Sequence, residues 1–183
     1  MKKQKKMNKY DELQRKLNIQ FKNPKLLDNA FIHRSFLNEH RADGIENNER
    51  LEFLGDAVLE LVISTYLFKN YPNKSEGDLT NIRAAVVRTE SLAEESRALG
   101  FGEYLQMSKG EEDSGGKDKD YLLANTFEAV LGAIYLDQGF EVCDRYLEKT
   151  LLHKVPTIVE NNLFIDPKTQ AQELIQAQFK VTP

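Results

Sequence analysis

The stretch that decides the fold runs over residues 48–58 and reads Asn48-Glu49-Arg50-Leu51-Glu52-Phe53-Leu54-Gly55-Asp56-Ala57-Val58. It sets three carboxylates into a segment whose other positions are mostly apolar. Charges are seldom placed in a core-forming helix unless something compensates them, and a bound cation would do so. The stretch is therefore the first candidate for a site with chemistry.

This stretch opens a long helix, which we expect from about residue 47 to residue 70. Its apolar positions recur at helical spacing: Leu51, Leu54, Val58, Leu61, Val62, Thr65 and Tyr66. Gly55 lies in the helix interior, where glycine costs about 1 kcal/mol relative to alanine. Such a glycine predicts the close approach of another backbone.

The acidic side chains of this helix form one stripe. Glu49, Glu52, Asp56 and Glu60 follow i, i+3, i+7, i+11 spacing and fall within roughly 80° of arc. No Lys or Arg at i+4 relieves their mutual repulsion. A solvated acidic face is the usual explanation of such a stripe, but the apolar faces opposite it and Gly55 favour a metal site here.

A second apolar helix is expected over residues 121–136, and it carries Asn125 and Glu128 as an i, i+3 pair. If the two helices cross, these two side chains can converge with Glu52 and Asp56. An all-oxygen set of this kind suits Mg²⁺ or Mn²⁺ rather than zinc.

The rest of the pattern is also helical, so the expected fold class is all-α. Residues 39–47 and the glycine-rich stretch 108–120 are expected to be loops. Asn23-Pro24, the capping box of Ser75 with Asp78, and Gly100 mark helix ends. Further helices are expected over 8–17, from residue 24 onward, over 75–88, 91–99 and 140–160, and from 166 to about 179.

Composition limits the class of protein. With 183 residues, 40% of them hydrophobic, the chain has room for one domain and a piece of another. Its net charge of −4 argues against a protein that is basic all over. The single cysteine, Cys143, excludes an intrachain disulfide and favours a reducing, cytoplasmic setting. No apolar run reaches the roughly 20 residues that span a bilayer, and residues 1–7 are interpreted as a basic tail.

At this point the sequence resembles the ribonuclease III family. Residues 48–58 match the family signature over their whole length, and Ile32-His33-Arg34-Ser35 resembles an earlier family motif. The segments 76–80, 109–116 and 127–137 also resemble family segments, so that the resemblance covers roughly residues 8–160. Independently of the resemblance, we expect His33 to make a local hydrogen bond rather than to bind metal. Arg34 is expected to pair with acidic residues of the long helix.

The resemblance implies an all-helical nuclease domain that dimerises and cuts double-stranded RNA. By the family pattern Glu52, Asp56 and Glu128 hold the divalent metal and residue 125 assists. Glu49 and Glu76 line the cleft as secondary acids. The products carry a 5′-phosphate, a 3′-hydroxyl and a short 3′ overhang, and the expected role is in rRNA and mRNA processing.

The resemblance also gives Phe53 a part in dimerisation, since the family pattern has it plug a pocket on the partner subunit. An ordinary core aromatic is the other interpretation of Phe53, and the sequence pattern does not separate the two.

One position departs from the family. The residue at 125 is usually Asp there and is Asn125 here, which keeps a carbonyl oxygen but loses a negative charge. Two functions from different classes follow: an active endoribonuclease, or a catalytically weakened RNA-binding scaffold with the same fold. A di-iron helical bundle uses Glu-x-x-His pairs, and none of the three histidines lies three residues after an acid.

The carboxyl-terminal segment, from Asp166, resembles the first helix of a double-stranded-RNA-binding domain. Thr169, Gln172 and Gln176 share one face, which in that family touches the minor groove and its 2′-hydroxyls. The remaining strands and helix of such a domain are missing, so the piece is expected to be truncated. The expected organisation is therefore a tail (1–7), a nuclease domain (8–160), a linker (161–165) and this fragment (166–183).

Overall fold

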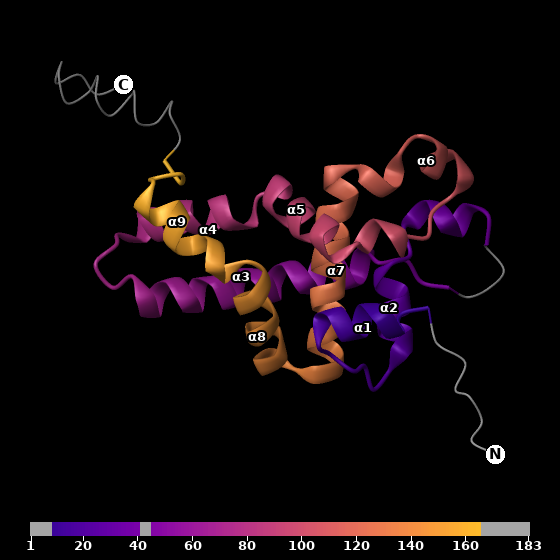
Figure 1. Ribbon diagram of the computed structural model, residues 1–183, viewed down its shortest axis with the longest axis horizontal. Helices are drawn as coiled ribbons and strands as arrows, with labels where there is room; N and C mark the ends of the chain where they lie inside the picture. Colours follow the sequence, from indigo (N-terminus) through magenta and orange to yellow (C-terminus); the bar gives the residue numbers. More distant parts are fainter. Residues whose placement is uncertain (1–8, 41–44, 166–183) are drawn as a thin grey trace.

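The protein is described here by a computed structural model that places residues 9–40 and 45–165 (Figure 1). Within these ranges it is helical, and its one β feature is an isolated parallel bridge between Ile32 and Gln106. The α-helices are α1 (Asp11–Leu17), α2 (Pro24–Ala30), α3 (Glu49–Asn70), α4 (Glu76–Val87), α5 (Thr89–Leu99), α6 (Lys109–Asp113), α7 (Asp120–Gln138), α8 (Phe140–Thr150) and α9 (Val155–Glu160). Four 3₁₀ turns join them: η1 (Arg34–Asn38), η2 (Phe101–Glu103), η3 (Gly116–Asp118) and η4 (Leu152–Lys154).

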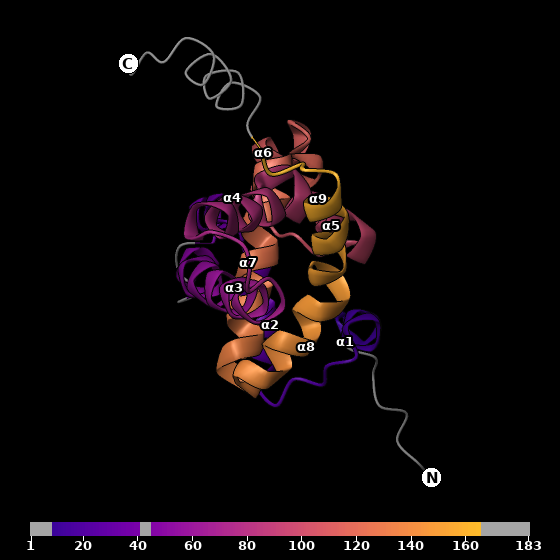
Figure 2. The same ribbon diagram turned by 90° about the vertical axis from the view of Figure 1, so that its left-hand side faces the viewer.

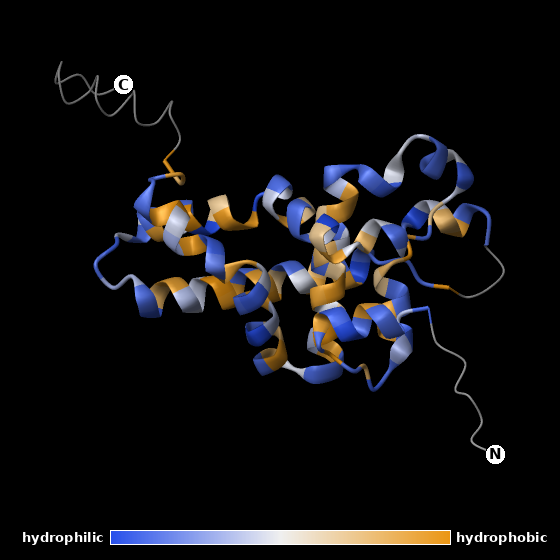
Figure 3. Ribbon diagram, viewed as in Figure 1, coloured by the Kyte–Doolittle hydropathy of each residue, from blue (hydrophilic) through white to orange (hydrophobic). Residues whose placement is uncertain are grey.

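Two long helices organise the molecule. α3 has 22 residues and α7 has 19, and α7 crosses α3 steeply (Figure 1). The middle of α7 is buried nearly all round, because α2, α3, α5 and α8 all pack against it. Figure 3 shows hydrophobic residues gathered where α3 and α7 meet. This crossing is the centre of the core.

The shorter helices cover the crossing from outside. α8 and α9 follow one another along one side of the molecule, and α1 lies beside α8 (Figure 2). Cys143 of α8 is completely buried in the core. Among the described residues, no helix is long and apolar enough to cross a membrane.

The helix ends follow the capping residues in the sequence. Asn23 caps α2 by accepting a hydrogen bond from the backbone N–H of Lys25 at 3.2 Å. Ser75 and Asp78 form the expected capping box of α4. Gly100 ends α5 with φ of 75°, in the left-handed region that favours glycine.

Two sequence expectations about elements are wrong. Residues 140–160 do not form one helix, because the chain breaks after Thr150 and restarts in α9, where Pro156 occupies the first turn. A proline lacks the N–H that a continuous helix needs there. Residues 108–120 are not all loop, because Ser108 caps the short helix α6 by accepting from the N–H of Glu111 at 3.3 Å.

The helix expected from residue 166 lies outside the described residues, and so do Thr169, Gln172 and Gln176.

Candidate active site

The crossing of α3 and α7 is a direct contact between two backbones. A Cβ atom added to Gly55 would lie 1.8 Å from the carbonyl oxygen of Glu128, and one added to Gly132 would lie 2.2 Å from that of Leu51. Each helix therefore needs a glycine where it meets the other. This is the close backbone approach that Gly55 predicted. It brings the residues near Gly55 on α3 close to those near Gly132 on α7.

The carboxylates beside the crossing come together from both helices. Glu128 is half-buried, and this burial together with the charges of Asp56 and Glu52 raises its pKa to about 7. Burial also raises the pKa of Glu52, and Glu49 and Asp56 add to the effect. A hydrogen bond from the Asn125 side chain acts in the opposite direction. Glu52, Asp56 and Glu128 therefore lie near enough to act on one another's charge, with Asn125 hydrogen-bonded to Glu52.

The chemistry of this donor set matches a hard divalent cation, since three carboxylates and an amide offer only oxygen ligands. Burial first, and then the charges of Asp56 and Glu52, raise the pKa of Glu128, and a bound cation would offset all three effects. In the conformation described, no three His, Cys, Asp or Glu side chains within residues 9–40 and 45–165 are arranged to hold a metal ion. The residues fit a divalent metal by type and charge, whereas their present side-chain positions do not form a finished coordination shell.

A cleft of about 660 Å³ opens beside these acids. On one side it is lined by Glu49, Glu52 and Asn125, while Asp56 and Glu128 lie outside its wall. Arg34 faces Glu49 across it, with 3.8 Å between the guanidinium and the carboxylate. This is the pairing expected for Arg34, and both side chains are largely exposed, so the ion pair contributes little to stability.

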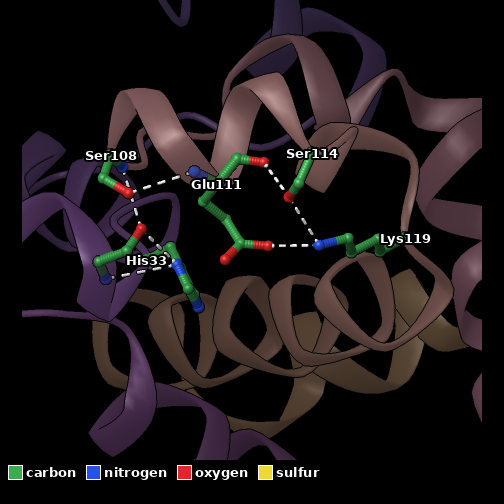
Figure 4. Close-up of polar contacts among 6 residues, drawn as sticks. His33, Ser108, Glu111, Ser114 and Lys119 are labelled. Carbon is green, nitrogen blue, oxygen red and sulfur yellow. Dashed lines mark hydrogen bonds and ion pairs between the residues drawn. The ribbon is translucent and has the colours of Figure 1, made fainter.

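The opposite wall of the cleft is built from the segment before α3 and from α6. His33 and Ser35 belong to the first segment and Glu111 to the second. Buried Asn48 ties the first segment to α3, because its side-chain amide donates to the carbonyl of Ala30 at 3.3 Å and its backbone N–H donates to that of Ile32 at 2.9 Å. The second segment is joined to the first by the backbone N–H of Ser108, which donates to the Ser35 hydroxyl at 3.0 Å (Figure 4).

His33 has the local structural role that the sequence indicated. Its Nδ1 lies 2.8 Å from the Ser35 hydroxyl and accepts from the Ser35 backbone N–H at 3.3 Å, which caps η1. Burial lowers the pKa of His33, with opposing contributions from Glu111, which raises it, and Arg34, which lowers it.

Not every acid of the predicted stripe belongs to this site. Glu60 is paired with Arg83 of α4 at 2.9 Å, so its charge is relieved from another helix, which within-helix spacing could not indicate. Glu76 lies at the start of α4 and lines a separate pocket of about 400 Å³ with Phe68 and Arg83. The structure thus does not bring Glu76 to the other acids within one chain.

Phe53 is not a core aromatic, because its side chain is 80% exposed. Leu61 was expected in the core and is instead 56% exposed, and Phe68 is 76% exposed. All three lie on α3, which therefore carries an exposed apolar face in addition to its buried one.

The cleft wall includes residues to which the sequence analysis gives no role in the site, among them Tyr121 and Glu111. Tyr121 precedes Asn125 by one helical turn and is half-exposed at the cleft, so its position could have been inferred from i, i+4 spacing. Glu111 was placed in a loop, although Ser108-Lys109-Gly110-Glu111 has the sequence form of a helix start.

Comparison with known proteins identifies a family to which most of the described part of the chain is similar. A family model described as Ribonuclease-III-like matches residues 23–155. Ribonuclease 3 of Geobacillus kaustophilus is 51% identical over 173 residues, which cover 94% of this chain and 70% of that protein. Ribonuclease 3 of Listeria monocytogenes is 46% identical over 170 residues, which cover 93% of this chain and 74% of that protein.

Solved structures with a similar fold include nuclease domains of ribonuclease III. A solved structure of the nuclease domain of ribonuclease III from Campylobacter jejuni, described for flexibility in a region involved in dimer formation, superimposes with a TM-score of 0.70. It is 42% identical, and the match covers 77% of this chain and 97% of that one. With the family model matching most of its length and the acids of α3 and α7 brought together at a glycine crossing, this chain belongs to the ribonuclease III family.

Proposed function

We propose that this protein is a divalent-metal-dependent endoribonuclease that hydrolyses phosphodiesters in double-stranded RNA. The observation that carries the proposal is the group of mutually repelling carboxylates at the crossing of α3 and α7, in which Glu52 and Glu128 are half-buried, Asp56 is exposed, and Glu128 has a pKa of about 7. Family membership supplies the reaction class, and the donor set supplies the reason for a metal.

Glu52, Asp56 and Glu128 would hold Mg²⁺, or Mn²⁺ in its place, with Asn125 assisting through its carbonyl oxygen. When bound, such an ion activates a water molecule and stabilises the charge that develops on the phosphodiester. The products would be a 5′-phosphate and a 3′-hydroxyl, with a short 3′ overhang on the duplex. Processing of rRNA and mRNA in the cytoplasm is the role proposed for this activity.

The protein's own residues prepare this site for substrate. Asn125 orients the Glu52 carboxylate through its hydrogen bond and favours the ionised form, which is the form that binds a cation. Arg34 keeps a guanidinium beside Glu49 at the mouth of the cleft, where an RNA phosphate can approach.

The exposed face of α3 supports a homodimer as the working form. Phe53, Leu61 and Phe68 present large apolar side chains to solvent, which is unfavourable unless a partner covers them. Phe53 of each chain would enter the pocket beside Phe68 on its partner. A second copy is also the simplest way for Glu76 to contribute to an acidic cleft from which it is separate within one chain.

The segment 166–183 would be the first part of a double-stranded-RNA-binding domain, following a nuclease domain over 8–160 and a linker over 161–165. Thr169, Gln172 and Gln176 would contact the minor groove in that assignment. The tail over 1–7 would add positive charge.

Cleavage of a long RNA duplex in the presence of Mg²⁺ tests the proposal, with Asn125→Asp as the companion variant. We expect the chain as it stands to cut the duplex into fragments with 5′-phosphate ends, and the Asp variant to cut faster because it restores a negative charge. If only the Asp variant cuts, Asn125 makes this chain the weakened scaffold. If neither variant cuts with Mg²⁺ or Mn²⁺, the proposed activity is wrong.

A further inference from the structure

The hydrogen bonds around His33 fix which of its ring nitrogens carries the proton. The backbone N–H of Ser35 can only donate, and it points at Nδ1 from 3.3 Å. The Ser35 hydroxyl oxygen already accepts from the backbone N–H of Ser108 at 3.0 Å, so its own proton is free to be donated to Nδ1 at 2.8 Å (Figure 4). Nδ1 is therefore an acceptor, and in the neutral ring the proton is on Nε2.

The protonated nitrogen, Nε2, takes no part in these hydrogen bonds with Ser35. Figure 4 shows the second ring nitrogen of His33 pointing away from the hydrogen bonds drawn to the first, and among the residues that the structure describes it has no hydrogen-bond partner. His33 lines the 660 Å³ cleft beside the candidate active site. Because Ser35 fixes Nδ1 as the acceptor, the Nε2–H of His33 is left in the cleft as a donor without a partner among the described residues.

An acceptor lies close to this donor. Glu111 lines the same cleft, and one of its carboxylate oxygens accepts from Lys119 at 2.7 Å while the other has no partner within the described residues (Figure 4). The hydrogen bond from Lys119 lowers the pKa of Glu111, which keeps this carboxylate ionised and able only to accept. The same cleft therefore carries a neutral donor and a charged acceptor, and the charge of Glu111 is felt at His33, whose pKa it raises.

This pair discriminates between the groups that an RNA strand could present. A phosphate accepts only, so it has no hydrogen to give to Glu111, and the negative charge of Glu111 would repel it from this wall. A hydroxyl both accepts and donates, so it can take a hydrogen bond from His33 and give one to Glu111. The 2′-hydroxyl is the group of this kind that RNA has and DNA lacks.

We infer that His33 and Glu111 bind a ribose 2′-hydroxyl next to the phosphate that is cut, and so help the site to select RNA. The inference rests on the proposed function, because it needs an RNA strand in the cleft. Ser35 and the backbone of Ser108 act as positioning groups that hold the His33 tautomer.

His33→Asn is the variant that tests the contact. Asn keeps the side-chain acceptor that caps η1, since Asn is a good N-cap residue, but it is too short to carry the donor into the cleft. His153→Asn is the matched control, because His153 is exposed on η4 and lies outside the cleft. Thermal unfolding of each variant reports whether the fold is retained.

The measurement is single-turnover cleavage of a set of RNA duplexes, each with one 2′-deoxy nucleotide at a different position around the cut. For the wild-type chain and His153→Asn we expect one position at which the deoxy substitution slows cleavage by about 5- to 10-fold, the value of one hydrogen bond. For His33→Asn the all-RNA duplex should be slowed by a similar factor, and the deoxy substitution at that position should add nothing.

The inference is overturned if His33→Asn keeps the same deoxy penalty as the wild type at every position, or if the wild type shows no such position. Cleavage of RNA by the wild type in those cases leaves the proposed function standing, whereas a wild type that cuts no duplex removes the proposed function first. The tautomer is checked separately by ¹⁵N NMR of the wild-type imidazole. A proton found on Nδ1 would contradict the proposed hydrogen bonds from Ser35 to His33, even if a variant did not fold.

Discussion

At the residue scale, Glu128 loses much of its contact with water at the helix crossing and faces two other acids. Its pKa of about 7 in the folded chain compares with 4.5 for the free side chain. The folded state therefore holds a proton that the unfolded state releases between these pH values, and ionising Glu128 above them destabilises the metal-free fold.

We predict that Glu128→Gln abolishes cleavage and stabilises the metal-free fold at pH 8 by about 2 kcal/mol, with no gain at pH 4. Gln has nearly the same volume but no charge to repel Glu52 and Asp56. Chemical denaturation at the two pH values measures the difference, and Glu148→Gln, on an exposed part of α8, serves as the control. Adding Mg²⁺ should stabilise the wild type and not the variant. Undiminished turnover by Glu128→Gln would remove this residue from the site.

A second residue-scale prediction concerns Gly55. Gly55→Ala places a methyl group 1.8 Å from the Glu128 carbonyl oxygen, so α3 and α7 must move apart or the variant must unfold. We expect a loss of about 3 kcal/mol or more in the free energy of unfolding, measured with urea. Gly110→Ala is the control, because nothing lies within 4 Å of its added Cβ. It should be neutral or slightly stabilising, and a Gly55→Ala variant as stable as this control would show that the crossing tolerates a side chain.

At the scale of elements, features that depend on neighbouring residues could be predicted from the sequence, whereas contacts between separate helices could not. The caps at Asn23, Ser75 and Gly100 depend on only a few neighbouring residues, so they could be predicted. Gly55 predicted a close backbone contact, but the sequence did not show that α7 makes it. The break before α9 was also encoded locally by Pro156, but the apolar spacing of residues 140–160 concealed it. The pairing of Glu60 with Arg83 joins two helices, and no pattern within one helix contains it.

One cation at the end of η4 joins it to α5, and its contribution can be tested. Lys154, just before α9, pairs with Glu94 at 2.8 Å and with Glu95 at 2.6 Å on α5, and the Glu95 side chain is only 14% exposed. Lys154→Met should lower the free energy of unfolding by about 1–3 kcal/mol, because it leaves a largely buried carboxylate unpaired. Thermal unfolding measures this loss. Lys149→Met, on an exposed part of α8 with no ion pair among the described residues, should change it by less than about 0.5 kcal/mol.

At the scale of the whole molecule, the exposure of Leu61 and Phe53 was the part of the fold that the sequence could not settle. Helical spacing marks a position as apolar, but it does not say whether the same chain or another chain covers it. The buried face of α3 packs on α7, and its second apolar face is left for a partner under the proposed dimer.

Phe53→Asp should therefore convert the proposed dimer to monomer and reduce cleavage, because a charge replaces the side chain that would enter the partner's pocket. Analytical ultracentrifugation reports the oligomeric state. Leu163→Asp is the matched control, since Leu163 is 60% exposed but follows α9 and is not part of α3. A variant at Phe53 that sediments like the wild type would contradict this role.

The buried position of Cys143 gives this chain a built-in reporter of how often its core opens. Burial raises the pKa of the thiol to about 12, and its side chain has no contact with solvent. A disulfide reagent that releases a coloured thiolate can react only with molecules in which α8 has come away from α7. The rate of colour development should thus follow how much of the chain is open, or the opening rate itself when the reagent reacts faster than the core recloses, and it should rise in Gly55→Ala without any added label.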